Sequence, residues 1–124
     1  MSDKLTKKIL ILEYDEMISD IYKKHFEKNG YLVILANETK VALEKIKKEE
    51  PILAFLDLLI ADGGGIEILR QLKDWPVKTK FVIFSNNQDT EKSQEAKALG
   101  AVEFLIKADY TPEKLLKTVE GYLK

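Results

Sequence analysis

The sequence predicts an α/β domain in which helices cover both faces of a five-stranded parallel sheet. Apolar runs and segments with helical periodicity alternate five times along the chain, an order typical of parallel sheets with right-handed crossovers. The run at residues 52–56 is apolar throughout, as in a central strand that is buried on both faces. The chain has 124 residues, so we expect a single domain over residues 1–124.

Five apolar runs of strand length predict the strands, and polar residues follow each of them. The third run is bounded by Pro51 and stops on Asp57, which places this carboxylate at the carboxyl end of a central strand. The expected strands lie at residues 8–12, 32–35, 52–56, 81–84 and 102–106.

The first two helices are expected from apolar residues that recur at helical spacing. Asp15 can cap the first helix, predicted over residues 16–29, and Gly30 follows its end. Asn37 is the expected cap of the second helix, which should end before Pro51.

The remaining helices are marked by their starts and stops. Three glycines at residues 63–65 predict a loop, and the helix after it should end near Trp75. Asp89 or Thr90 can start a polar helix that ends at Leu99, with Gly100 at the left-handed position beyond its end. Thr111, with Pro112 directly after it, predicts a capped start for the last helix.

The composition is that of a globular protein, with 45% hydrophobic and 33% charged residues and a net charge of −1. Interleaved charges, and Arg70 as the sole arginine, give no footprint for nucleic acid. No apolar run is long enough to span a membrane or to form a signal-peptide core. The absence of cysteine excludes thiolate sites and fits a reducing compartment. We therefore expect a cytoplasmic protein with no nucleic-acid or membrane partner.

Chemically active side chains follow four of the five expected strands. In the strand order 2-1-3-4-5, the switch point between strands one and three brings their carboxylates to one crevice. Clustered carboxylates favour Mg²⁺, and a hydroxyl and an ammonium suit phosphate oxygens. An Asp nucleophile in such a site can form an aspartyl phosphate. The residues concerned are Glu13, Tyr14, Asp15, Asp57, Ser85 and Lys107.

These motifs resemble the receiver domains of two-component response regulators, including the chemotaxis regulators, over essentially the whole chain. The matching segments are residues 9–16, residues 56–58 with Asp62 and Gly65, residues 81–85 and residues 100–107. The resemblance implies a flavodoxin-like, three-layer (βα)5 fold. It also implies that Asp57 is the phosphoacceptor, Ser85 the switch hydroxyl, Lys107 the phosphate-contacting lysine, Phe104 the aromatic switch position and Glu13 a metal-pair acid.

Tyr14 is the main departure from the family pattern, because the family usually has a metal-binding Asp at this position. A phenol is a poor Mg²⁺ ligand. The resemblance then leaves Asp57, the backbone carbonyl of Leu59 and, acting mainly through water, Glu13, with Asp15 as a tentative substitute. We expect Mg²⁺ to bind weakly and Lys107 to pair readily with the unphosphorylated Asp57.

Two loops also depart from the pattern. Ala61 and the glycines after it predict an unusually flexible loop behind the phosphoacceptor. Ala108 stands where Pro commonly follows the lysine, so the bond between Lys107 and Ala108 is either trans or strained.

The resemblance implies a receiver that accepts a phosphoryl group on Asp57 from a sensor histidine kinase or phosphotransfer protein. The surface of the fourth helix, fifth strand and fifth helix would then bind a downstream partner or a second copy. The alternative is a degenerate receiver that signals without phosphorylation because of Tyr14. An enzyme acting on other substrates is disfavoured, since Leu59 stands where haloacid-dehalogenase-type phosphatases have their second Asp. At most, the chain would catalyse transfer to, and hydrolysis from, its own Asp57.

Overall fold

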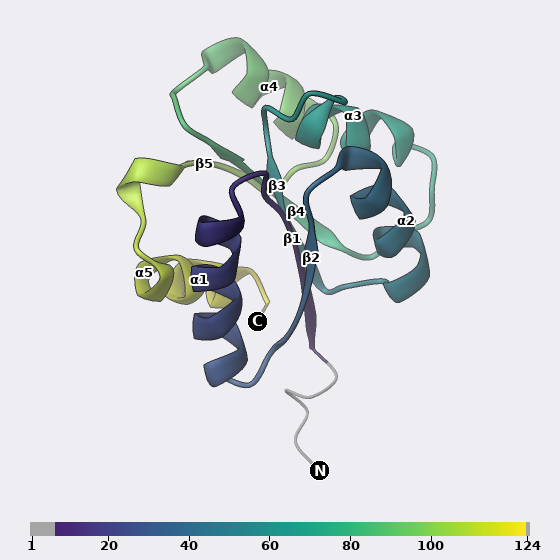
Figure 1. Ribbon diagram of the computed structural model, residues 1–124. Helices are drawn as coiled ribbons and strands as arrows, with labels where there is room; N and C mark the ends of the chain where they lie inside the picture. Colours follow the sequence, from purple (N-terminus) through teal and green to yellow (C-terminus); the bar gives the residue numbers. More distant parts are fainter. Residues whose placement is uncertain (1–6, 124) are drawn as a thin grey trace.

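The computed structural model describes residues 7–123, in which five strands alternate with five helices (Figure 1). A short 3₁₀ turn, Lys107–Asp109, separates the last strand from the last helix. The elements are β1 (Lys8–Leu12), α1 (Glu16–Lys28), β2 (Leu32–Ala36), α2 (Thr39–Glu49), β3 (Leu53–Asp57), α3 (Gly64–Gln71), β4 (Lys80–Ser85), α4 (Thr90–Ala98), β5 (Glu103–Ile106) and α5 (Pro112–Tyr122).

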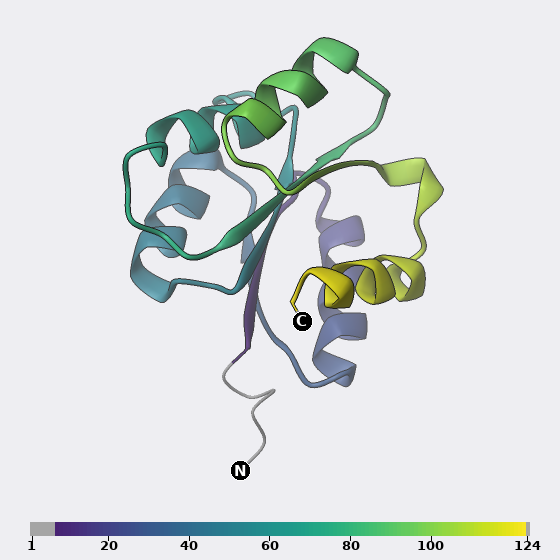
Figure 2. The same cartoon turned by 180° about the vertical axis from the view of Figure 1, so that it is seen from behind.

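The five strands form one parallel sheet in the order β2-β1-β3-β4-β5, which confirms the predicted topology. Helices α1 and α5 cover one face of the sheet, and α2, α3 and α4 cover the other (Figures 1 and 2). The fold is therefore the expected three-layer, flavodoxin-like sandwich. The carboxyl ends of β1 and β3 lie side by side at the point where the strand order reverses.

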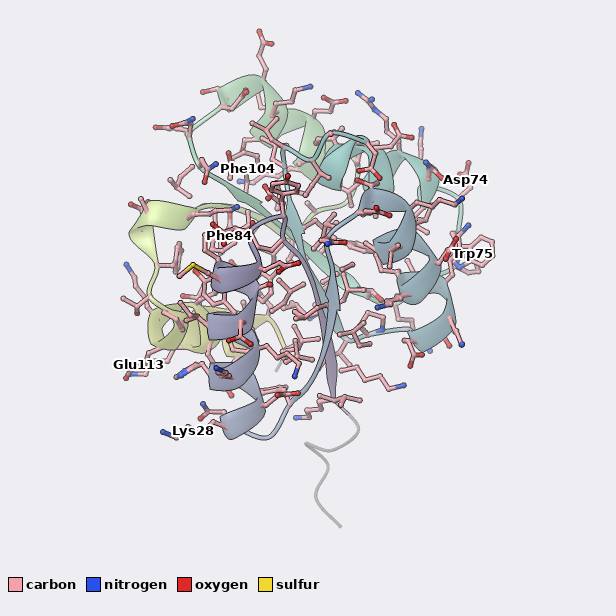
Figure 3. The ribbon with its side chains drawn as sticks, in the orientation of Figure 1. Lys28, Asp74, Trp75, Phe84, Phe104 and Glu113 are labelled. Carbon is pink, nitrogen blue, oxygen red and sulfur yellow. The ribbon has the colours of Figure 1, made fainter. Side chains whose placement is uncertain are left out.

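Two apolar clusters, one on each face of the sheet, form the core. Every residue of β3 is buried, as its uninterrupted apolar run predicts. Phe84 packs in the cluster beneath α1 and α5, whereas Phe104 packs against the opposite cluster (Figure 3). Each fully buried large side chain contributes about 1.5–3 kcal/mol relative to an exposed one.

Three predicted helix caps are present in the structure. Asp15 accepts the N–H groups of Met17 and Ile18 at the start of α1. Asp89 and Thr111 cap α4 and α5 in the same way, and Pro112 occupies the first turn of α5. These short polar side chains fix where the helices begin.

Several predicted element ends, and one predicted cap, differ from the structure. Asn37 does not cap α2: the N-cap residue is Glu38, and no side chain of its own segment supplies the capping bond. Gly64 and Gly65 belong to α3 and not to a loop. Helix α3 stops at Gln71, before Trp75: residues 72–74 form turns, in which the N–H groups of Lys73 and Trp75 donate to carbonyls three residues back instead of four. Strand β5 begins at Glu103, one residue after the predicted start.

No cis peptide bond occurs between residues 7 and 123, so the bond between Lys107 and Ala108 is trans. None of the helices in this range is both long enough and apolar enough to cross a membrane.

Candidate phosphoryl-acceptor site

Three charged side chains meet at the carboxyl edge of the sheet. Asp57 ends β3, Glu13 follows β1 and Lys107 follows β5. The Nζ atom of Lys107 lies 2.7 Å from Glu13 Oε1 and 3.2 Å from Asp57 Oδ2. Both carboxylates are buried, with 5% of Glu13 and 6% of Asp57 exposed. The parallel sheet thus brings together residues that are up to 94 positions apart in the sequence.

The Asp57 carboxylate has a different partner for each oxygen. Oδ1 accepts the N–H of Leu59 at 3.3 Å, while Oδ2 faces the Lys107 ammonium. Burial raises the pKa of the Asp57 carboxyl, and the Lys107 ammonium opposes that rise. A carboxylate this buried needs such a partner to remain ionised, which a nucleophile requires.

Glu13 is held from both sides. Its Oε1 atom contacts Lys107, and its Oε2 atom accepts the backbone N–H of Asp15 at 3.0 Å. The backbone N–H of Glu13 donates to Ala36, so the residue extends the pairing of β1 with β2. The first turn after β1 therefore orients the carboxylate toward β3.

Ser85 and Phe104 lie on the neighbouring strands. Ser85 ends β4, but its hydroxyl donates to the carbonyl of Asn87 at 2.7 Å and accepts the N–H of Asn87 at 3.2 Å. The structure therefore places Ser85 at the correct edge, with its hydroxyl bonded within its own loop. Phe104 lines a hollow of about 380 Å³ between α4 and β5.

Tyr14 and Asp15 do not join the charged cluster. The Tyr14 residue is 73% exposed. The carboxylate of Asp15 instead caps α1 through the N–H groups of Met17 and Ile18. Among residues 7–123, no group of three or more His, Cys, Asp or Glu side chains could hold a metal ion. The carboxylates that could hold a divalent cation at this edge are those of Glu13 and Asp57. Lys107 already contacts both of them.

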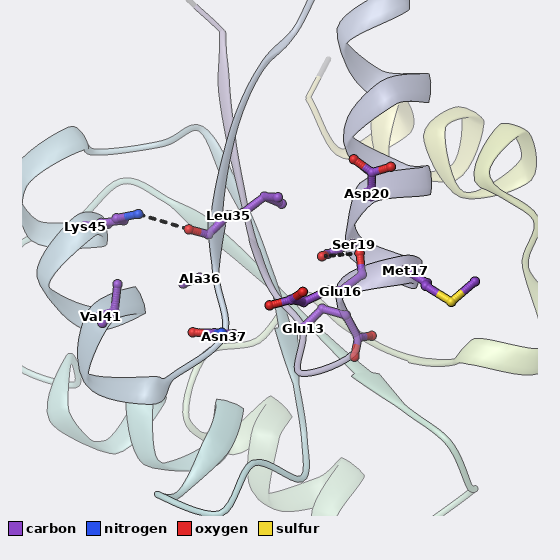
Figure 4. Close-up of a pocket in the computed structure, with 10 residues that line it drawn as sticks. All are labelled: Glu13, Glu16, Met17, Ser19, Asp20, Leu35, Ala36, Asn37, Val41 and Lys45. Atoms are coloured by element: carbon purple, nitrogen blue, oxygen red, sulfur yellow. Dashed lines mark hydrogen bonds between the residues drawn. The ribbon is translucent and has the colours of Figure 1, made fainter.

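A hollow of about 630 Å³ lies between α1 and α2 and reaches Glu13 (Figure 4). Its α1 side carries Glu16 and Asp20, and Lys45 of α2 donates to the backbone carbonyl of Leu35 at 3.0 Å on the other side. Lys45 thereby covers a carbonyl of the edge strand β2. Of the predicted site residues, Glu13 alone lines this hollow.

A smaller, largely apolar hollow of about 400 Å³ adjoins Lys107 on the α1 side. Ile18, Ile21 and Tyr22 of α1 form one wall, and Ala108 and Pro112 form the other. Elsewhere around the charged cluster, the apolar residues Tyr14, Met17 and Leu59 are mainly exposed. Apolar surface that surrounds a polar site favours contact with another protein.

Sequence reasoning missed the contribution of Thr39 and the contacts that Asp62 makes. The Asp62 carboxylate accepts the backbone N–H of Thr39, and the Thr39 hydroxyl accepts the N–H of Gly64. Thr39 has the side chain of a capping residue and stands two residues after the predicted cap, Asn37, which is the signal that could have revealed it.

Comparison with known proteins identifies the family to which this chain belongs. The family model for the response regulator receiver domain matches residues 9–120. This chain belongs to the response regulator receiver domain family. Its matched region contains Glu13, Asp57, Ser85 and Lys107.

Relatives of this receiver domain differ in length. It is 30% identical over 119 residues to sporulation initiation phosphotransferase F of Bacillus subtilis (strain 168), which covers 96% of this chain and 95% of that protein. It is 27% identical to the alkaline phosphatase synthesis transcriptional regulatory protein PhoP of the same organism, which covers 97% of this chain and 50% of PhoP. The chain thus spans about half the length of several relatives that it matches.

Solved structures agree with the fold of this receiver domain. The CheY-like response regulator receiver domain protein from Methanospirillum hungatei JF-1 is 29% identical, with a TM-score of 0.88 and coverage of 94% of this chain and 93% of that one. The orphan response regulator HP1043 of H. pylori is 14% identical, with a TM-score of 0.86 and coverage of 98% and 99%; this likeness concerns the fold alone.

Membership defines the general role of this receiver domain. Receiver domains are signalling proteins of two-component systems and are generally not classed as enzymes. They interact with histidine kinases or phosphotransfer partners, and they typically bind Mg²⁺ at the phosphorylation site.

Proposed function

We propose that this chain is a single receiver domain in the cytoplasm that accepts a phosphoryl group on Asp57 from a sensor histidine kinase or phosphotransfer protein. The observation that carries the proposal is the buried Asp57 carboxylate, which lies 3.2 Å from the Lys107 ammonium at the carboxyl edge of the sheet. Sporulation initiation phosphotransferase F is a relative of nearly the same length, and its name describes a phosphotransferase. This likeness supports a phosphotransfer role for the present chain.

The chemistry assigns one task to each residue. A carboxylate oxygen of Asp57 attacks phosphorus, the bond from phosphorus to the donor's imidazole nitrogen breaks, and an acyl phosphate forms. Lys107 is already at the carboxylate and neutralises charge on the arriving phosphoryl oxygens. Ser85 would turn its hydroxyl from Asn87 toward the new phosphoryl group. Hydrolysis would remove the phosphoryl group: water attacks phosphorus, the bond from phosphorus to the Asp57 oxygen breaks, and inorganic phosphate leaves the regenerated carboxylate.

Glu13 and Asp57, with the Leu59 carbonyl, would hold Mg²⁺. The cation would neutralise negative charge on the phosphoryl oxygens. Two carboxylates in place of three attract a dication less strongly, and Lys107 competes for both of them. Asp15 would have to give up the α1 cap to serve as a ligand. We therefore propose weak Mg²⁺ binding at this site.

Two surfaces suit the two kinds of partner. The apolar hollow next to Lys107 and the exposed Tyr14 and Met17 would receive the phosphoryl donor, because they lie around the site. The surface of α4, β5 and α5, where Phe104 is partly buried, would bind a downstream protein or a second copy. No nucleic-acid contact is proposed for this region, since its charges of opposite sign are interleaved.

Tyr14 favours one alternative, a receiver that signals without phosphorylation. In that case the Lys107 ammonium would take the place of Mg²⁺ at the two carboxylates. The surface of α4, β5 and α5 would then keep one conformation. The alternative and the main proposal differ in what Mg²⁺ does to the chain.

The deciding experiment is a Mg²⁺ titration of the phosphorylation rate with acetyl phosphate, followed by intact mass. The main proposal predicts that the parent is modified slowly and needs more Mg²⁺ than Tyr14→Asp, which restores a third carboxylate. The alternative predicts no modification of the parent at any Mg²⁺ concentration. Tight Mg²⁺ binding by the parent, unaffected by Tyr14→Asp or Asp15→Ala, would contradict our account of the site.

A further inference from the structure

The loop after Asp57 provides the missing cap of α2. The first N–H groups of a helix need acceptors, and Glu38, the N-cap residue of α2, supplies none from its side chain. Asp62 supplies them from another part of the chain: its carboxylate oxygens lie 3.1 and 3.0 Å from the Thr39 nitrogen, and one lies 3.4 Å from the Lys40 nitrogen. The loop is therefore bonded to the start of α2.

The start of α2 in turn caps α3. The N-cap residue of α3 is Gly63, which has no side chain to accept a hydrogen bond. The Thr39 hydroxyl accepts the N–H of Gly64 at 2.8 Å, and only 3% of Thr39 is exposed. Hydrogen bonding by the Thr39 side chain also lowers the pKa of the Asp62 carboxyl. Each of the two segments thus satisfies the orphan backbone groups of the other.

Two glycines allow this loop to pack closely against the end of β3. Gly64 has a φ of 71°, and a Cβ atom on it would lie 2.2 Å from the carbonyl oxygen of Leu58 and 3.0 Å from that of Asp57. A Cβ atom on Gly65 would lie 2.6 Å from Cδ1 of Ile83. A side chain does not fit at Gly64, and one at Gly65 would require the Ile83 side chain to move. The absence of a side chain at Gly64 thus permits close contact with the backbone of Asp57 and Leu58.

The same loop holds one oxygen of Asp57. The N–H of Leu59 donates to Oδ1 at 3.3 Å, so the orientation of the carboxylate depends on where residues 58–63 lie. The turn closes with the Gly63 N–H on the Ile60 carbonyl at 2.9 Å, which ties the Leu59 end of the loop to the Asp62 end.

We propose that Asp62 and Thr39 are positioning residues for phosphorylation: their reciprocal capping fixes the loop whose Leu59 N–H orients Asp57. This role deepens the proposed phosphoacceptor function of Asp57 and rests on it. It also connects α2 to the site, because the loop that orients Asp57 is hydrogen-bonded to the start of α2.

The test uses two disruptive variants, two conservative variants and a matched control. Thr39→Val removes the hydroxyl and Asp62→Ala removes the carboxylate, whereas Thr39→Ser keeps the hydroxyl and Asp62→Asn keeps one acceptor oxygen. Thr111→Val removes the corresponding hydroxyl at the cap of α5, which accepts the N–H of Lys114 at 3.1 Å. Three quantities are measured for each protein: thermal midpoint, amide exchange of Leu59, and the rate of phosphorylation by acetyl phosphate.

We expect Thr39→Val and Asp62→Ala to speed Leu59 exchange and to slow phosphorylation at least tenfold, since a misplacement of about 1 Å can cost about a hundredfold. Thr39→Ser should restore both quantities, and Asp62→Asn should lie between the parent and Asp62→Ala. Thr111→Val should lower the thermal midpoint and leave the other two quantities at parent values.

The proposal is overturned if Thr39→Val and Asp62→Ala lower only the thermal midpoint, as the control does. If the parent takes up no phosphoryl group, the function proposed for Asp57 fails, and Leu59 exchange still decides the positioning role. Faster exchange in Thr39→Val and Asp62→Ala alone would support it, and parent-like exchange in both would refute it.

Discussion

At the residue scale, the site is organised by one ammonium group that contacts two buried carboxylates. Lys107 lies closer to Glu13 than to Asp57, at 2.7 Å against 3.2 Å, and only 12% of its side chain is exposed. Two buried carboxylates without a cation would repel each other and lose their hydration. Lys107 therefore stabilises the unphosphorylated fold in addition to its proposed role at the phosphoryl group.

Lys107→Ala should lower the free energy of unfolding by about 3 kcal/mol, because it leaves buried charge without a partner. Urea denaturation at pH 8 measures this change. Lys117→Ala is the control: its pair with Glu113 spans 3.8 Å on the surface, so its removal should change the free energy of unfolding by less than about 0.5 kcal/mol. Equal midpoints for the parent and Lys107→Ala would contradict this view of the cluster.

The positions of these residues at the carboxyl edge could be predicted from the sequence, whereas most of their hydrogen-bond partners could not. Glu13, Asp57, Ser85 and Lys107 could be placed because each follows a strand of a parallel sheet. The bond from Ser85 to Asn87 could not, since hydroxyl rotation depends on local loop geometry. The capping role of Asp62 was equally inaccessible, because its partner Thr39 is 23 positions away.

At the scale of elements, α4 is joined to the body of the domain largely by charge. Ala96 is its only buried residue. The Arg70 guanidinium of α3 bonds Glu95, which also lies 3.6 Å from Lys92. Exposed pairs of this kind contribute only about 0.2–1 kcal/mol each, so α4 should open more easily than the other helices.

Glu95→Gln should speed hydrogen exchange of the α4 amides several-fold, because a neutral amide holds Arg70 less strongly. The urea midpoint should barely change, since the pair is exposed. Raising the salt concentration should speed α4 exchange in the parent and have less effect in the variant. Glu113→Gln, on the surface pair of α5, serves as the control. Parent-like α4 exchange in Glu95→Gln would show that apolar contacts suffice to hold this helix.

Helix α5 is joined to the sheet by hydrogen bonds from two tyrosines. Tyr31, just before β2, donates to Glu120 at 2.8 Å, and Tyr122 donates to Glu103 of β5 at 3.1 Å. For both phenols, burial first and then the glutamate partner raise the pKa to about 12. An unfolded tyrosine has a pKa of about 10.

Because the folded pKa is the higher one, this stabilisation is fully present below pH 10 and is lost as the pH rises through 12. The thermal midpoint should therefore fall between pH 10 and pH 12. Tyr31→Phe should start from a lower midpoint at pH 9 and show a smaller fall. Thermal scans between pH 9 and pH 12 check this expectation, and an unchanged fall in both Tyr31→Phe and Tyr122→Phe would contradict it.

At the scale of the whole molecule, the strand order and the two helical layers followed from the sequence. Five apolar runs alternating with helical periodicity leave few parallel topologies, and the buried run that ends at Asp57 marks the centre of the sheet. Boundaries were harder, because helix ends depend on tertiary contacts. Gly64 and Gly65 belong to α3 and pack closely against Leu58 and Ile83, contacts that no local pattern reveals.

The fold places the Asp57 carboxylate at the carboxyl edge of the sheet beside Lys107. Our central proposal is that Asp57 is the phosphoacceptor, and intact mass tests this proposal most directly. The parent and Asp57→Asn are incubated with acetyl phosphate and Mg²⁺ and then weighed by mass spectrometry. The account predicts that the parent gains the mass of one phosphoryl group and that Asp57→Asn gains none. Equal gain by the two proteins would contradict the assignment of Asp57 as the phosphoacceptor.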